Sequence, residues 1–441
     1  MFFLSALLVG LTPWIAGGLL GLLLSRKYCP AVRLLVALSF ALLAQEALAI
    51  LGLVLASFGI NIFSTTTVVL LLVAIAVLGW LNRPQRLKAT IAVRFAPAVF
   101  LCLFSCLFIF LSFVAFTLPA SGWDTLWHWA PISVELLQTQ TQEPPISWHY
   151  SGTHPATVAA ISAWWAAWYP GGEWTIGFGA WILCWISASV AVGSYVYATC
   201  RNLTISLFAA YIVASMPLLE NHALQGGYAE IFIVCHVVIS AALLNIGAKK
   251  RDKFLLALGL LVATGTIALK NIGWLYGLAV IVGLIISHYR LFTPLVQTLA
   301  LAVIAFIFIG ISQHDENIQF FFGNRTLSLE MTNTGQIFTN QIYALFVNSS
   351  FSIAPLLFFT ALGLSWTASG GQQNYSELPL VAAAFTLGFL TLSQFTDYGF
   401  LYALPQSDTG NSRLSIPFAA MSIMTIPYIV ERIQMRRATG P

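Results

Sequence analysis

Two residues of one polar segment, an aspartate and a histidine, can do acid–base chemistry. Asp124 directly follows Trp123, and His128 comes four residues after the acid, on the same face if the segment is helical. Partial burial among aromatic side chains raises the pKa of a carboxyl group toward the range in which a general base works. We therefore interpret Asp124 as a general base. The alternative is an aromatic belt at a membrane surface, in which Asp124 is simply solvated.

Two further segments supply candidate binding residues. His154 lies at the start of an apolar stretch, and Tyr228 and Glu230 follow two adjacent glycines. Such glycines permit a positive φ or a close approach of backbone to a ligand. Glu230 directly precedes another apolar stretch, where the dipole of a helix amino terminus favours a carboxylate. Glu230 is thus either a binding residue or an ordinary acid at a helix start.

Two cations complete the set of candidate residues. Lys270 lies between two apolar stretches, and Arg413 directly precedes the last one. A lysine that dips into hydrocarbon needs an anionic partner, which is either a protein carboxylate or a phosphate. The planar fork of an arginine suits phosphate. The alternative for both is snorkelling to the lipid headgroups. Because a single glutamate makes a poor divalent site, the sequence indicates no metal-ligating residues, and a bound divalent ion is left as an open alternative.

The elements that position these residues must be membrane helices. The 441 residues are 59% hydrophobic and only 8% charged, whereas soluble domains have about 25% charged residues. With about 20 apolar residues per crossing, helices consume nearly the whole chain. We predict an all-α, polytopic transmembrane bundle of about thirteen helices and expect no nucleic-acid partner. The predicted crossings are residues 2–24, 34–57, 65–80, 95–118, 174–198, 203–219, 231–248, 254–268, 272–287, 294–311, 353–366, 378–395 and 414–430.

The basic residues fix the predicted orientation. Sixteen of the 19 Lys and Arg residues fall in alternate connecting segments, which the positive-inside rule makes cytoplasmic. Lys270, Arg325 and Arg413 are the exceptions. The sequence therefore predicts an integral protein of a bacterial inner membrane, with the amino terminus outside, the carboxyl terminus in the cytoplasm and the candidate residues on the periplasmic face.

The chain resembles membrane glycosyltransferases of the GT-C fold that use polyprenyl-phosphate sugars, the class that contains the family 39, protein O-mannosyltransferase-like enzymes. The resemblance covers roughly residues 95–441. Glu230 stands where many relatives have Asp. The motifs that carry the resemblance are Trp123-Asp124-Thr125-Leu126, His154-Pro155, Gly227-Tyr228-Ala229-Glu230, Leu269-Lys270-Asn271 and Arg413 ahead of Pro417.

This resemblance implies an inverting glycosyltransferase. Asp124 is then similar to the catalytic base of the family, Lys270 and Arg413 hold the lipid phosphate, and Trp123, His128, His154, Tyr228 and Glu230 bind substrate. The donor is a polyprenyl-phosphate-linked sugar, and the acceptor is a glycan, a lipid or a protein. Residues 119–173 form a large catalytic outer loop with interfacial helices, and residues 313–352 form a second outer loop. Residues 1–94 are additional amino-terminal helices.

Two other functions fit a polytopic chain. A transporter or flippase for a lipid-linked or polar substrate also needs polar groups between helices, and a polysaccharide polymerase or ligase also has large outer loops. Glu46, inside the second predicted helix, is either a functional intramembrane acid or a residue hydrogen-bonded to a neighbouring helix.

Overall fold

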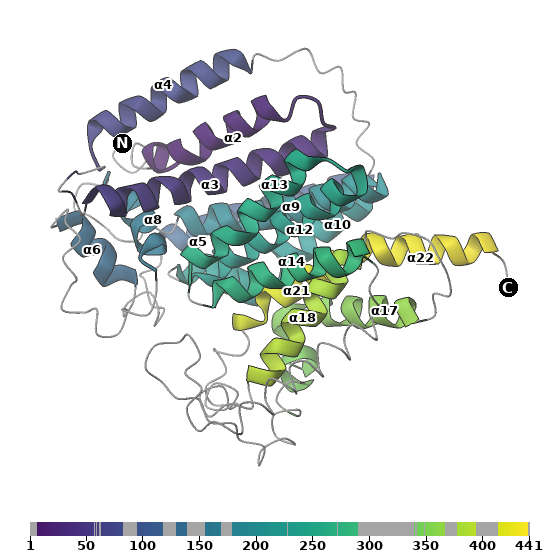
Figure 1. The fold of residues 1–441 in the computed structure, drawn as a ribbon. Coiled ribbons are helices and arrows are strands. Elements are labelled where there is room, and N and C mark those ends of the chain that lie inside the picture. Colours follow the sequence, from purple (N-terminus) through teal and green to yellow (C-terminus); the bar gives the residue numbers. More distant parts are fainter. Residues whose placement is uncertain are drawn as a thin grey trace.

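The described part of the chain is built from helices alone in the computed structural model (Figure 1). The high apolar content explains this, because a helix satisfies every backbone polar group within one segment. The structure describes residues 7–56, 58, 60, 63–82, 95–117, 129–138, 155–168, 179–226, 228–270, 272–289, 339, 342–347, 349–366, 377–393 and 413–439.

Most of the described α-helices overlap the apolar segments predicted from the sequence, with ends that differ by up to about ten residues. Their bounds are α2 (Thr12–Leu24), α3 (Pro30–Ala56), α4 (Thr65–Leu81), α5 (Phe95–Thr117), α6 (Ala130–Gln138), α8 (Thr157–Ala166), α9 (Gly179–Cys200), α10 (Leu203–Ala214), α11 (Pro217–Gln225), α12 (Glu230–Lys250), α13 (Lys253–Gly265), α14 (Gly273–Tyr289), α17 (Ala354–Trp366), α18 (Leu378–Ser393), α21 (Ile416–Ile423) and α22 (Ile426–Thr439). Short turns of 3-10 helix are η3 (Thr266–Ala268) and η5 (Ser349–Phe351), and η4 (Tyr343–Val347) is a π-helix.

Several of these helices are long and apolar enough to cross a membrane. Five described helical segments meet that requirement, one of them α21 and α22 taken together, or six if α10 and α11, which bend by 57° at their junction, form one span. Other apolar helices, among them α2, α4, α13 and α14, are shorter. The protein is therefore an all-α integral membrane protein. The count of thirteen crossings remains a prediction, and the predicted crossing at 294–311 lies outside the described residues.

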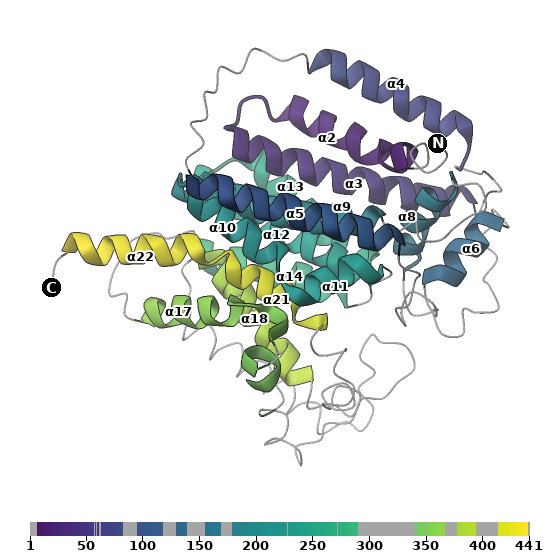
Figure 2. The same ribbon diagram turned by 180° about the vertical axis from the view of Figure 1, so that it is seen from behind.

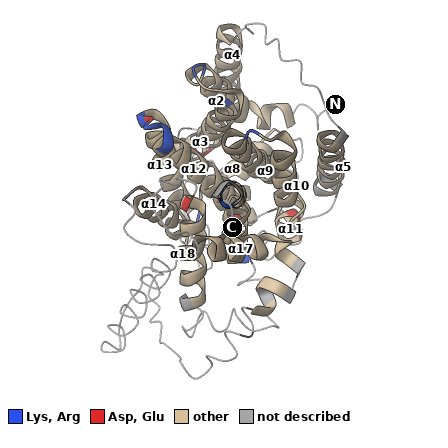
Figure 3. Ribbon diagram, turned by 90° about the vertical axis from the view of Figure 1, so that its right-hand side faces the viewer, with Lys and Arg blue, Asp and Glu red and all other residues tan. Residues whose placement is uncertain are grey.

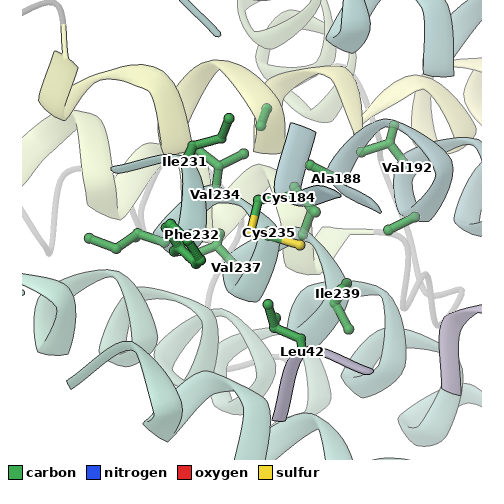
Figure 4. Close-up of a cluster of buried hydrophobic side chains, with 14 of the residues drawn as sticks. Leu42, Cys184, Ala188, Val192, Ile231, Phe232, Val234, Cys235, Val237 and Ile239 are labelled. Carbon is green, nitrogen blue, oxygen red and sulfur yellow. The ribbon is translucent and has the colours of Figure 1, made fainter. Parts of the chain in front are cut away.

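Helix α12 forms the centre of the bundle. Every residue from Glu230 to Ala248 is buried, and α12 packs against α3, α9, α13, α14 and α21. Figure 4 shows part of this core, in which the thiols of Cys184 on α9 and Cys235 on α12 lie side by side among Ile, Val and Leu side chains. A helix that is apolar on all faces is expected at such a central position.

The amino-terminal helices form a layer against this core. Helix α3 packs on α9, α12 and α13, while α2 packs on α3 and α4 covers α2 from outside (Figure 2). Glycines allow the close contact between α2 and α3, because a Cβ at Gly17 would overlap the carbonyl oxygen of Phe40. On α4 only Val68 is buried. The remaining apolar side chains of α4 suit contact with lipid.

Three basic turns meet at one end of the bundle. The Tyr28 hydroxyl, between α2 and α3, donates a hydrogen bond of 2.7 Å to Asp252, between α12 and α13. Lys27 Nζ lies 3.5 Å from the same carboxylate. Figure 3 shows the basic residues that flank the start of α13. Arg201, between α9 and α10, is close to the same group of turns through Cys29. We call this the basic end.

Asp252 joins two of these turns and also caps α13. Its Oδ1 accepts hydrogen bonds from the backbone N–H groups of Phe254 (3.0 Å) and Leu255 (3.2 Å). Partial burial acts to raise the pKa of Asp252, but the hydrogen bonds from Tyr28 and Leu255 and the charge of Lys27 outweigh it and lower the pKa below its usual value. The carboxylate form of Asp252 therefore stabilises the fold.

Candidate functional site

Four of the eight predicted site residues lie together in the structure. Tyr228, Glu230, Lys270 and Arg413 come from three widely separated stretches of the chain and meet near the end of α12 opposite the basic end. The other four lie outside the described residues. They are Trp123, Asp124, His128 and His154.

Glu230 and Lys270 form a buried ion pair. Helix α12 begins at Glu230, as the sequence predicted. Lys270 lies two residues after η3, the 3-10 turn that follows α13. Lys270 Nζ lies 2.7 Å from Glu230 Oε1, and the two residues are 9% and 1% exposed. The sequence predicted an anionic partner for Lys270, and in the structure this partner is Glu230. A charge-assisted hydrogen bond of this length is among the stronger polar contacts of proteins.

Arg413 lies over an aromatic pair. Its guanidinium carbon is 4.9 Å from the centroid of the Tyr228 ring, within the range of a cation–π interaction. The Tyr228 ring is in turn 4.7 Å from the ring of His222, a buried residue of α11. The electrostatic influence of both Arg413 and Lys270 extends to Glu230. Lys270, Arg413 and Glu230 together carry a formal charge of +1.

Two hydrogen bonds hold the segments that carry these residues. The indole Nε1 of Trp181 on α9 donates to the carbonyl oxygen of Tyr228 at 3.0 Å. The hydroxyl of Tyr276 on α14 donates to the carbonyl oxygen of Leu414 at 2.7 Å, next to Arg413. Both donors are fully buried. The backbone on each side of the site is therefore fixed by a helix of the core, which favours preorganised binding.

Two acceptor atoms of the site have no hydrogen-bond partner within the described part of the chain. One is Glu230 Oε2, and the other is His222 Nε2. His222 Nδ1 lies 2.8 Å from the carbonyl oxygen of Leu218, which only accepts, so the ring proton of a neutral His222 is on Nδ1. Both Glu230 Oε2 and His222 Nε2 can then accept hydrogen bonds from hydroxyl groups of a ligand. The site thus combines two cations with two acceptors.

The turn before α12 has the backbone that its glycines predicted. Gly226 ends α11 with a φ of 60°, which a residue with a side chain rarely adopts. This conformation turns the chain from α11 into the segment of Tyr228. Gly227 lies outside the described residues.

Three residues of the site were missed by reasoning from the sequence. His222, on α11, lies six residues before Tyr228 in the same polar stretch of the sequence, and its proximity to Glu230 in the sequence was an available signal. Trp181 and Tyr276 lie inside apolar helices, where the sequence pattern does not distinguish them from other core residues. Within the described residues, no group of three or more His, Cys, Asp or Glu side chains is arranged to hold a metal ion.

The comparisons with known proteins give no relative for this arrangement. No family model matches the chain, and no curated protein and no solved structure is similar enough to count as a match.

Proposed function

We propose that the protein is an inverting membrane glycosyltransferase with a GT-C-like fold, which moves a sugar from a polyprenyl-phosphate donor to an acceptor hydroxyl. The observation that supports this most is the meeting of Lys270 and Arg413, from distant parts of the chain, around Glu230 and Tyr228. A phosphate leaving group gathers negative charge as its bond to the sugar breaks, and two fixed cations stabilise that charge.

The acceptors of the site suit the sugar of such a donor. Glu230 Oε2 and His222 Nε2 are buried and can accept hydrogen bonds from sugar hydroxyls. The face of Tyr228, which lies between His222 and Arg413, adds an aromatic surface. Lys270 holds Glu230 Oε1 and so fixes the direction of the remaining carboxylate oxygen.

The proposed reaction is a single displacement. The acceptor oxygen attacks the anomeric carbon from the face opposite the phosphate, the new C–O bond forms, and the bond to the phosphate oxygen breaks with its electron pair on the phosphate. The acceptor proton passes to Asp124, which we propose as the general base. Asp124 belongs to the predicted loop 119–173 and lies outside the described residues.

The orientation of the proposed site follows from the charges. The candidate site lies at the opposite end of α12 from Lys249 and Lys250. The positive-inside rule puts the basic end in the cytoplasm. We therefore propose that transfer takes place on the periplasmic face of a bacterial inner membrane.

Binding of a polyprenyl phosphate to the full-length protein in lipid nanodiscs tests the proposal. The matched probe is the polyprenol, which has the same chain without the phosphate. We expect Arg413→Ala to weaken binding of the phosphate at least tenfold and to leave binding of the polyprenol unchanged. Arg436→Ala, an exposed cation on α22, is the control and should change neither. Equal affinity for both lipids, or an Arg413→Ala variant with native affinity, would refute the proposal.

A transporter or flippase is the second candidate, and one observation favours it. Glu46 on α3 and His236 on α12 are buried and in contact inside the bundle, and ionisable residues at such positions often mark substrate or proton pathways. Proteoliposomes that move polyprenyl-phosphate sugars between leaflets, without any transfer to an acceptor, would favour this candidate. Transfer that Asp124→Asn abolishes while lipid binding persists would favour the enzyme.

A further inference from the structure

Glu46 and His236 lie against each other in the interior of the bundle. Glu46 Oε1 is 2.6 Å from His236 Nε2, and the two side chains are 5% and 0% exposed. Glu46 belongs to the amino-terminal helices, outside the part of the chain that carries the family resemblance. His236 is on α12, six residues after Glu230 and therefore about 9 Å further along the helix axis.

The contacts of this pair determine how many protons it holds. His236 Nδ1 is 2.8 Å from the carbonyl oxygen of Phe232, which only accepts, so Nδ1 carries a proton. Glu46 Oε1 and His236 Nε2 are 2.6 Å apart, and neither atom has a hydrogen bond of regular geometry within the described residues. Two acceptor atoms without a proton repel each other at this distance, so the contact favours one proton shared between Glu46 and His236. Whether Glu46 or His236 carries it, the pair has no net charge, as its burial requires.

The pair also supports the turn that carries Lys270. A Cβ at Gly265, the last residue of α13, would lie 3.1 Å from Glu46 Oε2 and 3.1 Å from His236 Nε2. Gly265 therefore packs so close to both side chains that a Cβ would be tighter than an ordinary contact. Residues 266–268 form η3, and Lys270 follows two residues later to reach Glu230. The same pair thus contacts both the helix of Glu230 and the segment of Lys270.

We propose that Glu46 and His236 are positioning residues of the candidate site. One shared proton holds α3 against α12 and against the end of α13, and this contact keeps Lys270 on Glu230. The inference rests on the proposed function in one respect, namely that the position of Lys270 determines the affinity for a lipid phosphate. It gives the amino-terminal helices a role, since α3 supplies one of the two partners.

Two substitutions of Glu46 separate the proton from the volume of the side chain. Glu46→Gln keeps the shape and can donate an N–H to His236 Nε2, whereas Glu46→Met has a similar length and donates nothing. We expect Glu46→Gln to bind a polyprenyl phosphate within about threefold of the native protein and Glu46→Met to bind it about tenfold more weakly. Ser39→Ala is the control, because the buried Ser39 hydroxyl bonds only to Leu35 of its own helix among the contacts described. Equal affinities of the Gln and Met variants would overturn the role of the proton.

A double-mutant cycle separates positioning from a general structural effect. If Glu46 acts through Lys270, Glu46→Met should have no further effect on phosphate-lipid binding in a Lys270→Met background. If the two substitutions instead weaken phosphate-lipid binding by independent factors that multiply in the double variant, the proposal is overturned. Gly265→Ala, which keeps both titratable groups but adds a methyl group against them, replaces Glu46→Met in the cycle if that variant does not fold.

The same cycle distinguishes this inference from the proposed function. If the native protein binds no polyprenyl phosphate, the proposed function fails, but the cycle can be repeated with the stability of the protein in detergent as its readout. Coupling between Glu46 and Lys270 in stability would then still support the positioning role. Additive changes in stability would overturn that role as well.

Discussion

Replacement of Lys270 by methionine tests the central contact of the candidate site. The substitution keeps a long, flexible side chain but removes the ammonium group that lies 2.7 Å from Glu230 Oε1. Glu230 is 1% exposed, so little water reaches its carboxylate to replace the lost partner. The substitution therefore leaves a buried charge at the end of α12.

The expected cost follows from the burial of the pair. Removal of one partner of a buried ion pair destabilises proteins by about 3–5 kcal/mol. Two features of the site offset part of this cost, namely the amino terminus of α12, worth about 0.3–1 kcal/mol, and the charge of Arg413. We therefore expect Lys270→Met to lower the free energy of unfolding by about 3 kcal/mol, a factor of roughly 100 in the ratio of folded to unfolded protein.

Reversible unfolding by SDS in mixed micelles provides the assay. The double variant Lys270→Met/Glu230→Gln removes both charges. Its free energy of unfolding should lie within about 1 kcal/mol of the native value, because a neutral pair pays no large cost for the removal of charges from water. The double variant should then be about 2 kcal/mol more stable than Lys270→Met alone, and the double-mutant cycle with Glu230→Gln gives the coupling energy of the pair. A single variant within about 0.5 kcal/mol of the native protein, or a double variant with the summed loss of both single variants, would refute this account of the ion pair.

Three further predictions concern other contacts of the structure. Asp252→Asn keeps the helix cap but removes the charge. Because the pKa of native Asp252 is lowered, the native protein should be more stable than the variant above about pH 4 and should lose this advantage as the pH falls through the lowered pKa. Denaturation at a series of pH values measures this difference. Tyr276→Phe removes the hydrogen bond to Leu414 and should cost about 1 kcal/mol of stability and weaken phosphate-lipid binding; native affinity would show that this hydrogen bond does not position the site. Gly17→Ala should lower the thermal stability strongly because a Cβ there overlaps the backbone of α3, whereas Gly18→Ala, with its nearest neighbours at 3.9 Å, should have little effect; equal effects would contradict the packing of α2 on α3.

The helices were predictable because their signal is local. Apolar stretches bounded by polar turns gave the positions of α3, α4, α5, α12 and α17 to within a few residues. The break between α10 and α11 was not predicted, although Pro217 at the start of α11 marks it. Apolar composition continues through this break, so that hydropathy alone reads one segment.

The candidate site was predictable only in part. Lys270 and Arg413 could be identified because cations are rare in such a chain, and Glu230 because it precedes an apolar helix. Their mutual contacts depend on how helices pack, which no local pattern specifies. For the same reason the sequence left the partner of Glu46 open, and the structure identifies it as His236 on α12.

The long sequence separations within the site have a consequence for biosynthesis. Glu230 precedes its partner Lys270 by 40 residues, and Tyr276 precedes Leu414 by 138. At about 5–20 residues per second, a ribosome needs roughly 2–8 s to add Lys270 after Glu230. It needs up to about half a minute more to add Leu414, whose carbonyl oxygen accepts the hydrogen bond from Tyr276. During that interval the Glu230 carboxylate at the start of α12 lacks its ammonium partner. It must therefore contact water, lipid headgroups or the insertion machinery. The final helices therefore complete the site as well as anchor the chain, and a ribosome that stalls before residue 413 leaves a membrane-inserted bundle whose binding site is still open.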